Sequence, residues 1–306
     1  MTLNQILYAL AVFKAGSMNK ASEQLFISQP ALTSAIRALE EELGLQIFIR
    51  SSHGIQATNE GKEFLMYARQ VVQQFELLQD RFGLSKKRKK KFYVSCQHYS
   101  FATKAFVQLT EGYGLDQYDF GIKETRTFDV INDTASSNSE LGILFLSNFN
   151  RKFLLRLFEE RNLEFHPLIT CQAYVYLYRG HPLAQKESIR FEDLKHYPSM
   201  SFDQGDEGSL YLAEEILVEQ EFPRTIKVSD RATMLNLMRG VQGFTLCSGL
   251  ICEELNGTDY VAIPYECPDP QEATMEIGYI LPKRALLSDV GLEYVAQLER
   301  CFHGEN

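Results

Sequence analysis

The chain has 306 residues, of which 45% are hydrophobic and 23% are charged, and its net charge is −9. This is the composition of a globular protein with ample material for hydrophobic cores, and the length favours about two domains. No apolar run approaches the roughly eighteen residues that a membrane span needs, and the first residues lack the basic start and cleavage site of a secretory signal, so the sequence predicts neither a membrane protein nor a secreted one.

The six cysteines are scattered along the chain and form no Cys-x-x-Cys pair. Such spacing favours reduced thiols in the cytoplasm over a disulfide framework or a zinc site. Most of them fall in apolar predicted strands or helices, where a packed thiol is the expected role. We therefore expect a cytoplasmic protein with no metal site and no cofactor.

The charge is distributed unevenly between the two ends of the chain. Residues 1–91 contain 13 lysines and arginines against 8 acids, whereas residues 92–306 contain 18 against 32. A basic segment can contact phosphate groups while an acidic segment stays away from them. Six of the 13 positive charges lie in one run, Lys86 to Lys91.

Two short helices and a longer third one are predicted at the start of the chain. Apolar residues recur at helical spacing up to Gly16, which ends the first helix, and a second short helix follows. The third helix begins at Ser28, a good N-cap, has Pro30 in its first turn and ends at Gly44. Its apolar residues form one narrow stripe: Leu32, Ile36, Leu39 and Leu43.

The face opposite that stripe carries Pro30, Thr33, Ser34 and Arg37, and Gln29 lies on the flank at the N-terminal tip of the third helix. This arrangement describes a helix-turn-helix, whose second helix enters the major groove of DNA. Glutamine can pair with adenine, and arginine with guanine. Periodicity alone leaves a surface helix of an ordinary helical bundle as an alternative.

A predicted β-hairpin follows this helix directly. The segment "LQIFIRSSHGIQAT" contains two short strands around a turn at Ser51–Gly54, with Arg50 on the first strand and His53 near the tip. A hairpin in this place is typical of a wing, and a wing arginine can enter the minor groove or contact a phosphate.

The segment "ASEQLFISQPALTSAIRALEEELGLQIFIR", followed by Thr58 and Gly61, resembles the N-terminal signature of LysR-type transcriptional regulators. Ser22, Thr33, Ile49 and Ala57 depart from the residues usual in that signature, and Ala57 weakens the expected packing of the wing. The resemblance implies a winged helix-turn-helix domain over residues 1–58. The DNA contacts that it implies are Ser17, Lys20, Ser28, Gln29, Pro30, Thr33, Ser34, Arg37, Arg50, His53 and Thr58.

Residues 59–91 are predicted to form a linker helix and a hinge. An apolar stripe repeats every three or four residues up to Phe82, and a protruding helix with such a stripe needs a partner. In the LysR family this helix pairs two subunits; packing on the chain's own C-terminal domain is the alternative. The charged segment after Gly83 is expected to stay solvated, or to add non-specific phosphate contacts.

From Phe92 the pattern changes to strands alternating with helices, which predicts a parallel sheet with helices on its faces. The chain is predicted to leave a first lobe, build a second and return. The first lobe comprises 92–166 and 264–306, and the second comprises 167–263. An additional helical piece is expected from Asn148.

This region resembles the regulatory domain of the LysR family, a two-lobed α/β effector-binding domain of the periplasmic-binding-protein type. The resemblance implies a ligand cleft between the lobes, where the first amides of the helix after the first strand suit an anionic group. For each candidate residue an ordinary cap or turn hydroxyl is the alternative. The candidates are Tyr99, Ser100, Thr125, Arg126, Ser147, Ser201, Phe202 and Thr233.

The sequence therefore predicts an α/β protein that acts as a sequence-specific regulator, not as an enzyme. Its expected partners are double-stranded promoter DNA, a small-molecule effector and further copies of itself, as a homodimer through the linker helix and a homotetramer. The sequence contains no His-Glu-x-x-His, Gly-x-Ser-x-Gly or phosphate-binding-loop motif. Two alternatives remain: a solute-binding or enzymatic protein whose N-terminus only mediates oligomerisation, and a DNA-binding protein without an effector.

Overall fold

The computed structural model describes residues 1–51, 54–82, 89–114, 116–205 and 209–303. The chain forms two units, Met1–Lys87 and Arg88–Asn306, which are described separately below. Among the residues that the structure describes, no helix has the length and apolar character that a bilayer crossing requires.

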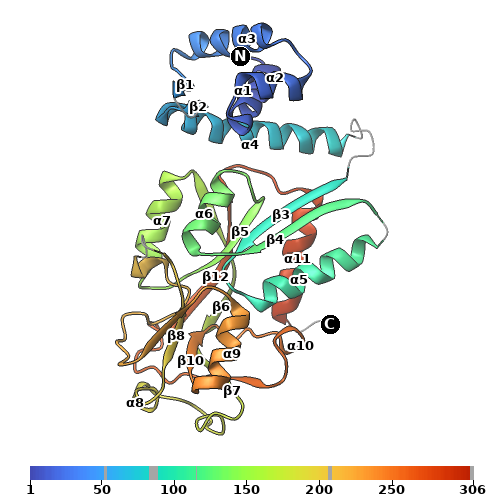
Figure 1. The fold of residues 1–306 in the computed structure, drawn as a ribbon. Helices are drawn as coiled ribbons and strands as arrows, with labels where there is room; N and C mark the ends of the chain where they lie inside the picture. Colours follow the sequence, from blue (N-terminus) through green and yellow to red (C-terminus); the bar gives the residue numbers. More distant parts are fainter. Residues whose placement is uncertain (52–53, 83–88, 115, 206–208, 304–306) are drawn as a thin grey trace. The chain divides into compact units, whose positions relative to one another are not determined.

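The first unit contains the predicted helices and hairpin (Figure 1). Its elements are α1 (Leu3–Ala15), α2 (Met18–Leu25), α3 (Gln29–Leu43), β1 (Phe48–Ser51), β2 (Gly54–Ala57) and α4 (Asn59–Arg81). Gly16 and Gly44 end α1 and α3 in the left-handed conformation, with φ of 62° and 69°. Glycine adopts this conformation at little cost, so both helices end where the sequence predicts.

The core of the first unit is formed by the apolar stripe of α3 and by α1. Leu32, Ile36 and Leu39 are buried against Ala9 and Val12. Burying each large aliphatic side chain contributes about 1.5–3 kcal/mol. This packing fixes which face of α3 remains exposed.

Three hydrogen bonds, each donated by a backbone N–H group, hold the hairpin and the residue before it against the helices. The Glu40 carboxylate accepts hydrogen bonds from the N–H groups of Ile47 (2.7 Å) and Phe48 (3.0 Å). The Ile55 N–H donates to the Gly16 carbonyl at 3.0 Å. The start of α4 approaches Ile47, the residue before β1, so closely that a Cβ at Gly61 would lie 2.1 Å from the Ile47 carbonyl oxygen. The position of the wing therefore depends on α3.

The second unit contains two five-stranded sheets (Figure 1). The first sheet has the order β4-β3-β5-β12-β6, and the second has the order β11-β7-β10-β8-β9. The elements up to the second sheet are β3 (Lys90–Cys96), α5 (Ser100–Tyr113), β4 (Tyr118–Glu124), α6 (Thr127–Ala135), β5 (Leu141–Leu146), α7 (Arg151–Glu160) and β6 (Leu163–Gln172). The remaining ones are β7 (Tyr174–Tyr178), α8 (Phe191–Leu194), β8 (Ser199–Phe202), a 3-10 turn η1 (Leu210–Leu212), β9 (Thr225–Val228), α9 (Arg231–Val241), β10 (Phe244–Cys247), α10 (Glu253–Asn256), β11 (Tyr260–Pro264), β12 (Thr274–Pro282) and α11 (Asp289–His303).

Helices cover both faces of the first sheet. α5 and α11 lie side by side on one face and α6 lies on the other (Figure 1). α7 is the additional helix expected after Asn148, and it buries Leu154 and Phe158.

Both sheets are mixed, whereas the alternating pattern predicted a parallel sheet. β3 pairs in parallel with β4 and β5, but β12 is antiparallel to both β5 and β6. In the second sheet β8 is parallel to β9 and β10, and β7 is antiparallel to β10 and β11. The reversed strands are β7, with which the chain enters the second sheet, and β12, which brings it back to the first.

The chain leaves the first sheet at Ala173 rather than at residue 166. β6 remains paired with β12 as far as Gln172, opposite Thr274. Pro167 has no N–H to donate, and a register shift next to Gly278 accommodates it within the strand. The strand therefore continues for ten residues.

Candidate DNA-binding surface and interlobe cavity

The front of α3 exposes the residues predicted to face DNA. Ser28 is the N-cap and accepts a hydrogen bond from the Ala31 N–H, and Pro30 and Ser34 are exposed. Arg37 has 79% of its side chain exposed and donates from Nε to the Glu41 carboxylate at 2.9 Å. Such a surface pair contributes about 0.3–0.5 kcal/mol, so Arg37 can exchange it for another acceptor.

Gln29 and Thr33 interact with each other one turn apart. The Gln29 Nε2 group donates to Thr33 Oγ1 at 2.8 Å, and both side chains are half-buried. This contact holds the Gln29 amide close to the helix and leaves its carbonyl oxygen as an acceptor.

The other predicted DNA contacts occupy different positions. Ser17 is the half-buried N-cap residue of α2, and Lys20 is exposed. The Thr58 hydroxyl already forms two hydrogen bonds within the first unit. It donates to the Gln46 carbonyl (2.6 Å) and accepts from the Gly61 N–H (2.8 Å). Arg50 lies on β1, but its side chain is not among those described, and His53 falls outside the described residues.

The second unit contains a cavity of about 60 Å³ between its two sheets. One side is lined by the loop after β3 and the start of α5, and the other by residues of β8, α9 and β10. Three of the predicted effector contacts line it: Tyr99, Ser100 and Phe202. A cavity of this size holds a few water molecules or a small ligand.

The remaining candidates lie outside this cavity. Ser147 accepts a hydrogen bond from Asn150 N–H and lines a second cavity, of about 400 Å³. The Thr233 hydroxyl bonds to Asp230 as part of the α9 cap. The others that do not line the first cavity are Thr125, Arg126 and Ser201.

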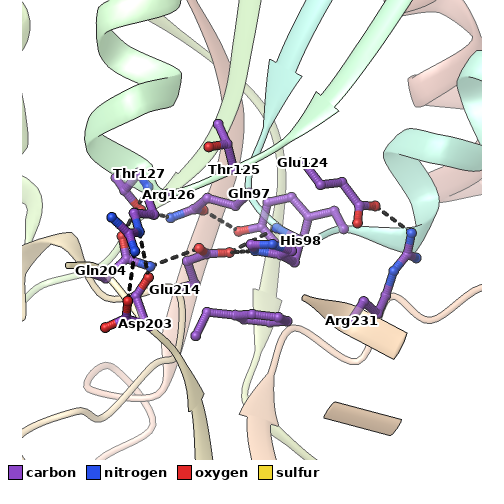
Figure 2. A network of polar contacts seen from close by, with 12 residues as sticks. Gln97, His98, Glu124, Thr125, Arg126, Thr127, Asp203, Gln204, Glu214 and Arg231 are labelled. Carbon is purple, nitrogen blue, oxygen red and sulfur yellow. Dashed lines mark hydrogen bonds and ion pairs between the residues drawn. The ribbon is translucent and has the colours of Figure 1, made fainter. Parts of the chain in front are cut away.

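Arg126 instead joins the two lobes. It donates from Nη2 to the Asp203 carboxylate at 2.7 Å and from Nε to the Asp203 carbonyl at 3.1 Å (Figure 2). Beside it, the Thr127 N–H donates to Gln204 Oε1 at 3.0 Å. At the other end of the network Arg231 of α9 forms an ion pair with Glu124 of β4.

A histidine–glutamate pair lies at the centre of this network. The backbone N–H and the Nδ1 atom of His98 each lie 2.8 Å from Glu214 Oε2, and both side chains are buried. Gln204 Nε2 donates to the other Glu214 oxygen at 2.8 Å. The Phe202 ring stacks on the His98 ring with 3.9 Å between centroids and an interplanar angle of 6°. The pair therefore links the loop after β3, in the first lobe, to the second lobe.

The adjacent Glu215 is a buried acid with one unsatisfied oxygen atom. Its side chain lines the cavity, the residue is 8% exposed, and Oε1 accepts a hydrogen bond from the Phe202 N–H at 2.8 Å. Oε2 is buried and has no hydrogen-bond partner among the described residues. Burial, together with the neighbouring Glu214 carboxylate, raises the pKa of Glu215 to about 8.

Sequence reasoning missed His98, Glu214, Glu215 and Arg231. His98 lies between the first strand of this region and the candidate Tyr99, which was a usable signal. The acids lie in "YLAEEILVEQ", where two adjacent glutamates interrupt an apolar run. That segment contains only the short η1 and has no regular period, so its position depends on long-range packing.

All six cysteines are free thiols, and Cys96 and Cys252 are buried. Burial raises the pKa of the Cys171 thiol to about 11 and that of Cys247 to about 12. Thiols with such pKa values are largely protonated and react slowly. Among the described residues no cluster of histidine, cysteine and acid side chains could hold a metal ion.

Two family models match the chain. The bacterial regulatory helix-turn-helix model of the lysR family matches residues 3–62, and the LysR substrate binding domain matches residues 122–300. The uncharacterized HTH-type transcriptional regulator YbhD of Escherichia coli is 25% identical over 93% of this chain and 87% of that protein. The regulator TfdT of Cupriavidus pinatubonensis is 42% identical over 24% of this chain and 32% of that protein.

The fold is similar to that of a solved regulator. The structure of a full-length OxyR variant from Pseudomonas aeruginosa matches with a TM-score of 0.67 and 18% identity over 98% of this chain and 95% of that chain. These matches confirm the expected fold, a winged helix-turn-helix followed by a two-lobed α/β domain. The chain belongs to the LysR family of bacterial transcriptional regulators, DNA-binding proteins with an effector-binding domain.

Proposed function

We propose that the front of α3 reads promoter DNA and that the interlobe cavity binds a small-molecule effector that changes the arrangement of paired subunits. The observation that carries the first part is the exposed polar face of α3, with Ser34 and Arg37 free of packing and the wing tied to the same helix through Glu40. An effector acts only through a difference in its affinity for two arrangements. We propose no catalytic activity for this chain.

We further propose a homodimer formed through α4, and a homotetramer built from two dimers. One face of α4 and the residue that follows it expose large apolar side chains, between 38% and 70% of each: Tyr67, Val71, Phe75, Leu78 and Phe82. They follow one another at intervals of three and four residues, which is the spacing of a helix-pairing stripe. A dimer of winged domains would read two half-sites.

The replacement Arg37→Ala tests the reading surface. The operator is first selected from random duplexes with the full-length wild-type protein, and affinities for it are then measured at fixed salt concentration. Loss of one arginine contact to a base costs about 1–3 kcal/mol, so we expect affinity for the operator to fall by roughly 5-fold to 150-fold. Affinity for unrelated duplexes should fall much less.

Lys14→Ala is the matched control, because Lys14 is an exposed cation of the same unit that lies on α1. It should leave the preference for the operator unchanged. Equal losses of specific binding in both variants would show a general charge effect and would contradict the role of α3 as the reading element.

A further inference from the structure

Glu215 is a residue that both cavities of the second unit have in common, because it lines each of them. It belongs to the second lobe, in the segment between β8 and β9. On the first-lobe side, the smaller cavity is lined by residues 98–100 and the larger one by residues 147–150. The exposure of Glu215, only 8%, therefore depends on contact between the lobes.

Tyr99 of the first lobe provides separate evidence for this proximity. Burial raises the pKa of the Tyr99 phenol well above its ordinary value, and the Glu215 carboxylate adds to this rise. A carboxylate has such an effect on a phenol only when the two groups are close together. If the lobes separated, Glu215 would lose this neighbour and gain water.

The segment that contains Glu215 is bound to the first lobe by polar contacts. Its neighbour in the chain, Glu214, accepts hydrogen bonds from the backbone N–H and Nδ1 of His98 and from Gln204 (Figure 2). Glu215 itself accepts from the N–H of Phe202, whose ring stacks on the His98 ring. A charge on Glu215 therefore develops beside the contacts that hold the lobes together.

The closed arrangement offers little to stabilise a negative charge on Glu215. Oε1 accepts one hydrogen bond, from the Phe202 N–H at 2.8 Å, and Oε2 has no partner in the described part of the chain. An ionised carboxylate has about four acceptor sites, and removing it from water without donors is costly. The Glu214 carboxylate is a second negative charge beside it, and two like charges in one buried place disfavour each other.

The protonation state of Glu215 consequently differs between closed and open lobes. In the closed form, burial and the Glu214 carboxylate raise the pKa of Glu215 from 4.5 to about 8. Once the lobes separate, water reaches the carboxyl group and its pKa returns toward the ordinary value. At any pH between these two values, opening releases a proton and closing takes one up.

The other ionisable groups that line the two cavities come from both lobes. Burial raises the pKa values of Tyr176 and Cys247 to about 12, and that of Tyr99 is also well above its ordinary value, so none of the three changes charge near neutral pH. Arg231 is paired with Glu124. The remaining groups are Glu214, Glu219, Glu272 and His98.

We propose that closure of the two lobes is coupled to protonation of Glu215, which makes the second unit sensitive to pH. The closed arrangement holds the proton, and the open arrangement releases it to water. A rise in pH therefore shifts the equilibrium toward the open arrangement. No effector is needed for this response, although a ligand that closes the lobes would take up the same proton.

Hydrogen exchange at two amides of the full chain measures lobe opening. The N–H groups of His98 and Thr127 donate to Glu214 and Gln204 across the lobes, so they exchange when the lobes separate. Each exchange rate is divided by the rate of the same amide in an unfolded chain at the same pH. This ratio should rise about tenfold from pH 6 to 7 and about fivefold from pH 7 to 8.

The variant Glu215→Gln isolates the proton. Glutamine keeps the shape of the side chain but does not titrate, so the ratios for His98 and Thr127 should not change between pH 6 and 8. Glu221→Gln removes an exposed acid of the same segment and should behave as the wild type does.

The amides of β5 distinguish lobe opening from unfolding of the whole unit. β5 lies in the middle of the first sheet, between β3 and β12, so its amides exchange only when that sheet comes apart. They should exchange more slowly than His98 and Thr127 at every pH. Equal ratios at both places would mean that the lobes do not open separately, and the proposed device would be overturned.

Two other results would also overturn the coupling. The first is a ratio for His98 and Thr127 that stays constant with pH in the wild type. The second is a pH dependence that survives in Glu215→Gln, which would assign the proton to another group, with His98 as the nearest candidate. If Glu215→Gln does not fold, the wild-type curve decides: it should level off above about pH 8, and levelling below pH 7 would exclude Glu215.

Discussion

A carboxylate buried beside a second carboxylate keeps its proton at a pH where a free one has lost it. Glu215 is in this situation, next to Glu214 and accepting a hydrogen bond from Phe202. Between the usual pKa of a glutamate and about 8, the folded chain therefore holds a proton that the unfolded chain releases. This group stabilises the fold fully only at low pH, and its contribution is lost as pH rises toward 8.

The replacement Glu215→Gln should remove this pH dependence. A raised pKa of one group lowers the free energy of unfolding by up to about 1.4 kcal/mol per pH unit across that window. Urea unfolding of the full chain at pH 5, 6, 7 and 8 measures it, followed by circular dichroism because the chain has no tryptophan. Parallel curves for wild type and variant would refute the assignment, and Glu221→Gln should behave as wild type.

Individual residues also show what a sequence pattern can and cannot predict. Leu32, Ile36 and Leu39 were predicted as core residues because helical periodicity reports which face of a single helix is buried. The contacts of Glu40 could not be predicted in this way. Its bonds to Ile47 and Phe48 depend on how the following loop returns, which the period of α3 does not encode.

At the scale of elements, the exposed apolar stripe of α4 predicts which side chains hold the proposed dimer together. Replacing Val71 and Leu78 together by glutamate should convert a dimer to a monomer, because two charges would enter an apolar contact. Sedimentation velocity measures the change, and operator affinity should fall with it. Gln73→Glu adds one acid on the opposite side of the helix and should leave the dimer intact. A dimer that survived the double replacement would place the contact elsewhere.

The positions of helices and strands along the sequence were easier to predict than the directions of the strands within the sheets. The end of α3 at Gly44 matches the sequence prediction, because a glycine cap is a local signal. The antiparallel direction of β12 was missed, since it follows from the chain's return to the first sheet and not from any residue within the strand. The DNA-contact residues could be named from the signature, whereas the residues of the cavity come from both lobes and could be named only in part.

At the scale of the whole molecule, the ion pairs between the two lobes of the second unit should determine how often the lobes open. Arg231→Gln removes the ion pair to Glu124, a contact between half-buried side chains of different lobes. We expect faster hydrogen exchange at the amides of His98 and Thr127, by about tenfold, because both are protected by acceptors from the opposite lobe. Arg239→Gln, which removes an exposed pair to Asp259 within the second lobe, should leave these amides unchanged. Unchanged exchange in both variants would show that other contacts keep the lobes closed.

The two places where the chain passes between the lobes are joined at one residue. Ala173 donates its N–H to the Ala273 carbonyl at 2.8 Å and accepts from the Tyr265 N–H at 3.0 Å. Two paired connecting segments can act as a hinge, so the lobes can rotate about an axis near Ala173. Met275, two residues beyond Ala273, lines the cavity, so the cavity lies close to that axis. A rotation that shifts atoms by a fraction of an ångström at the cavity shifts atoms at the outer ends of the lobes by much more, because those atoms lie farther from the axis.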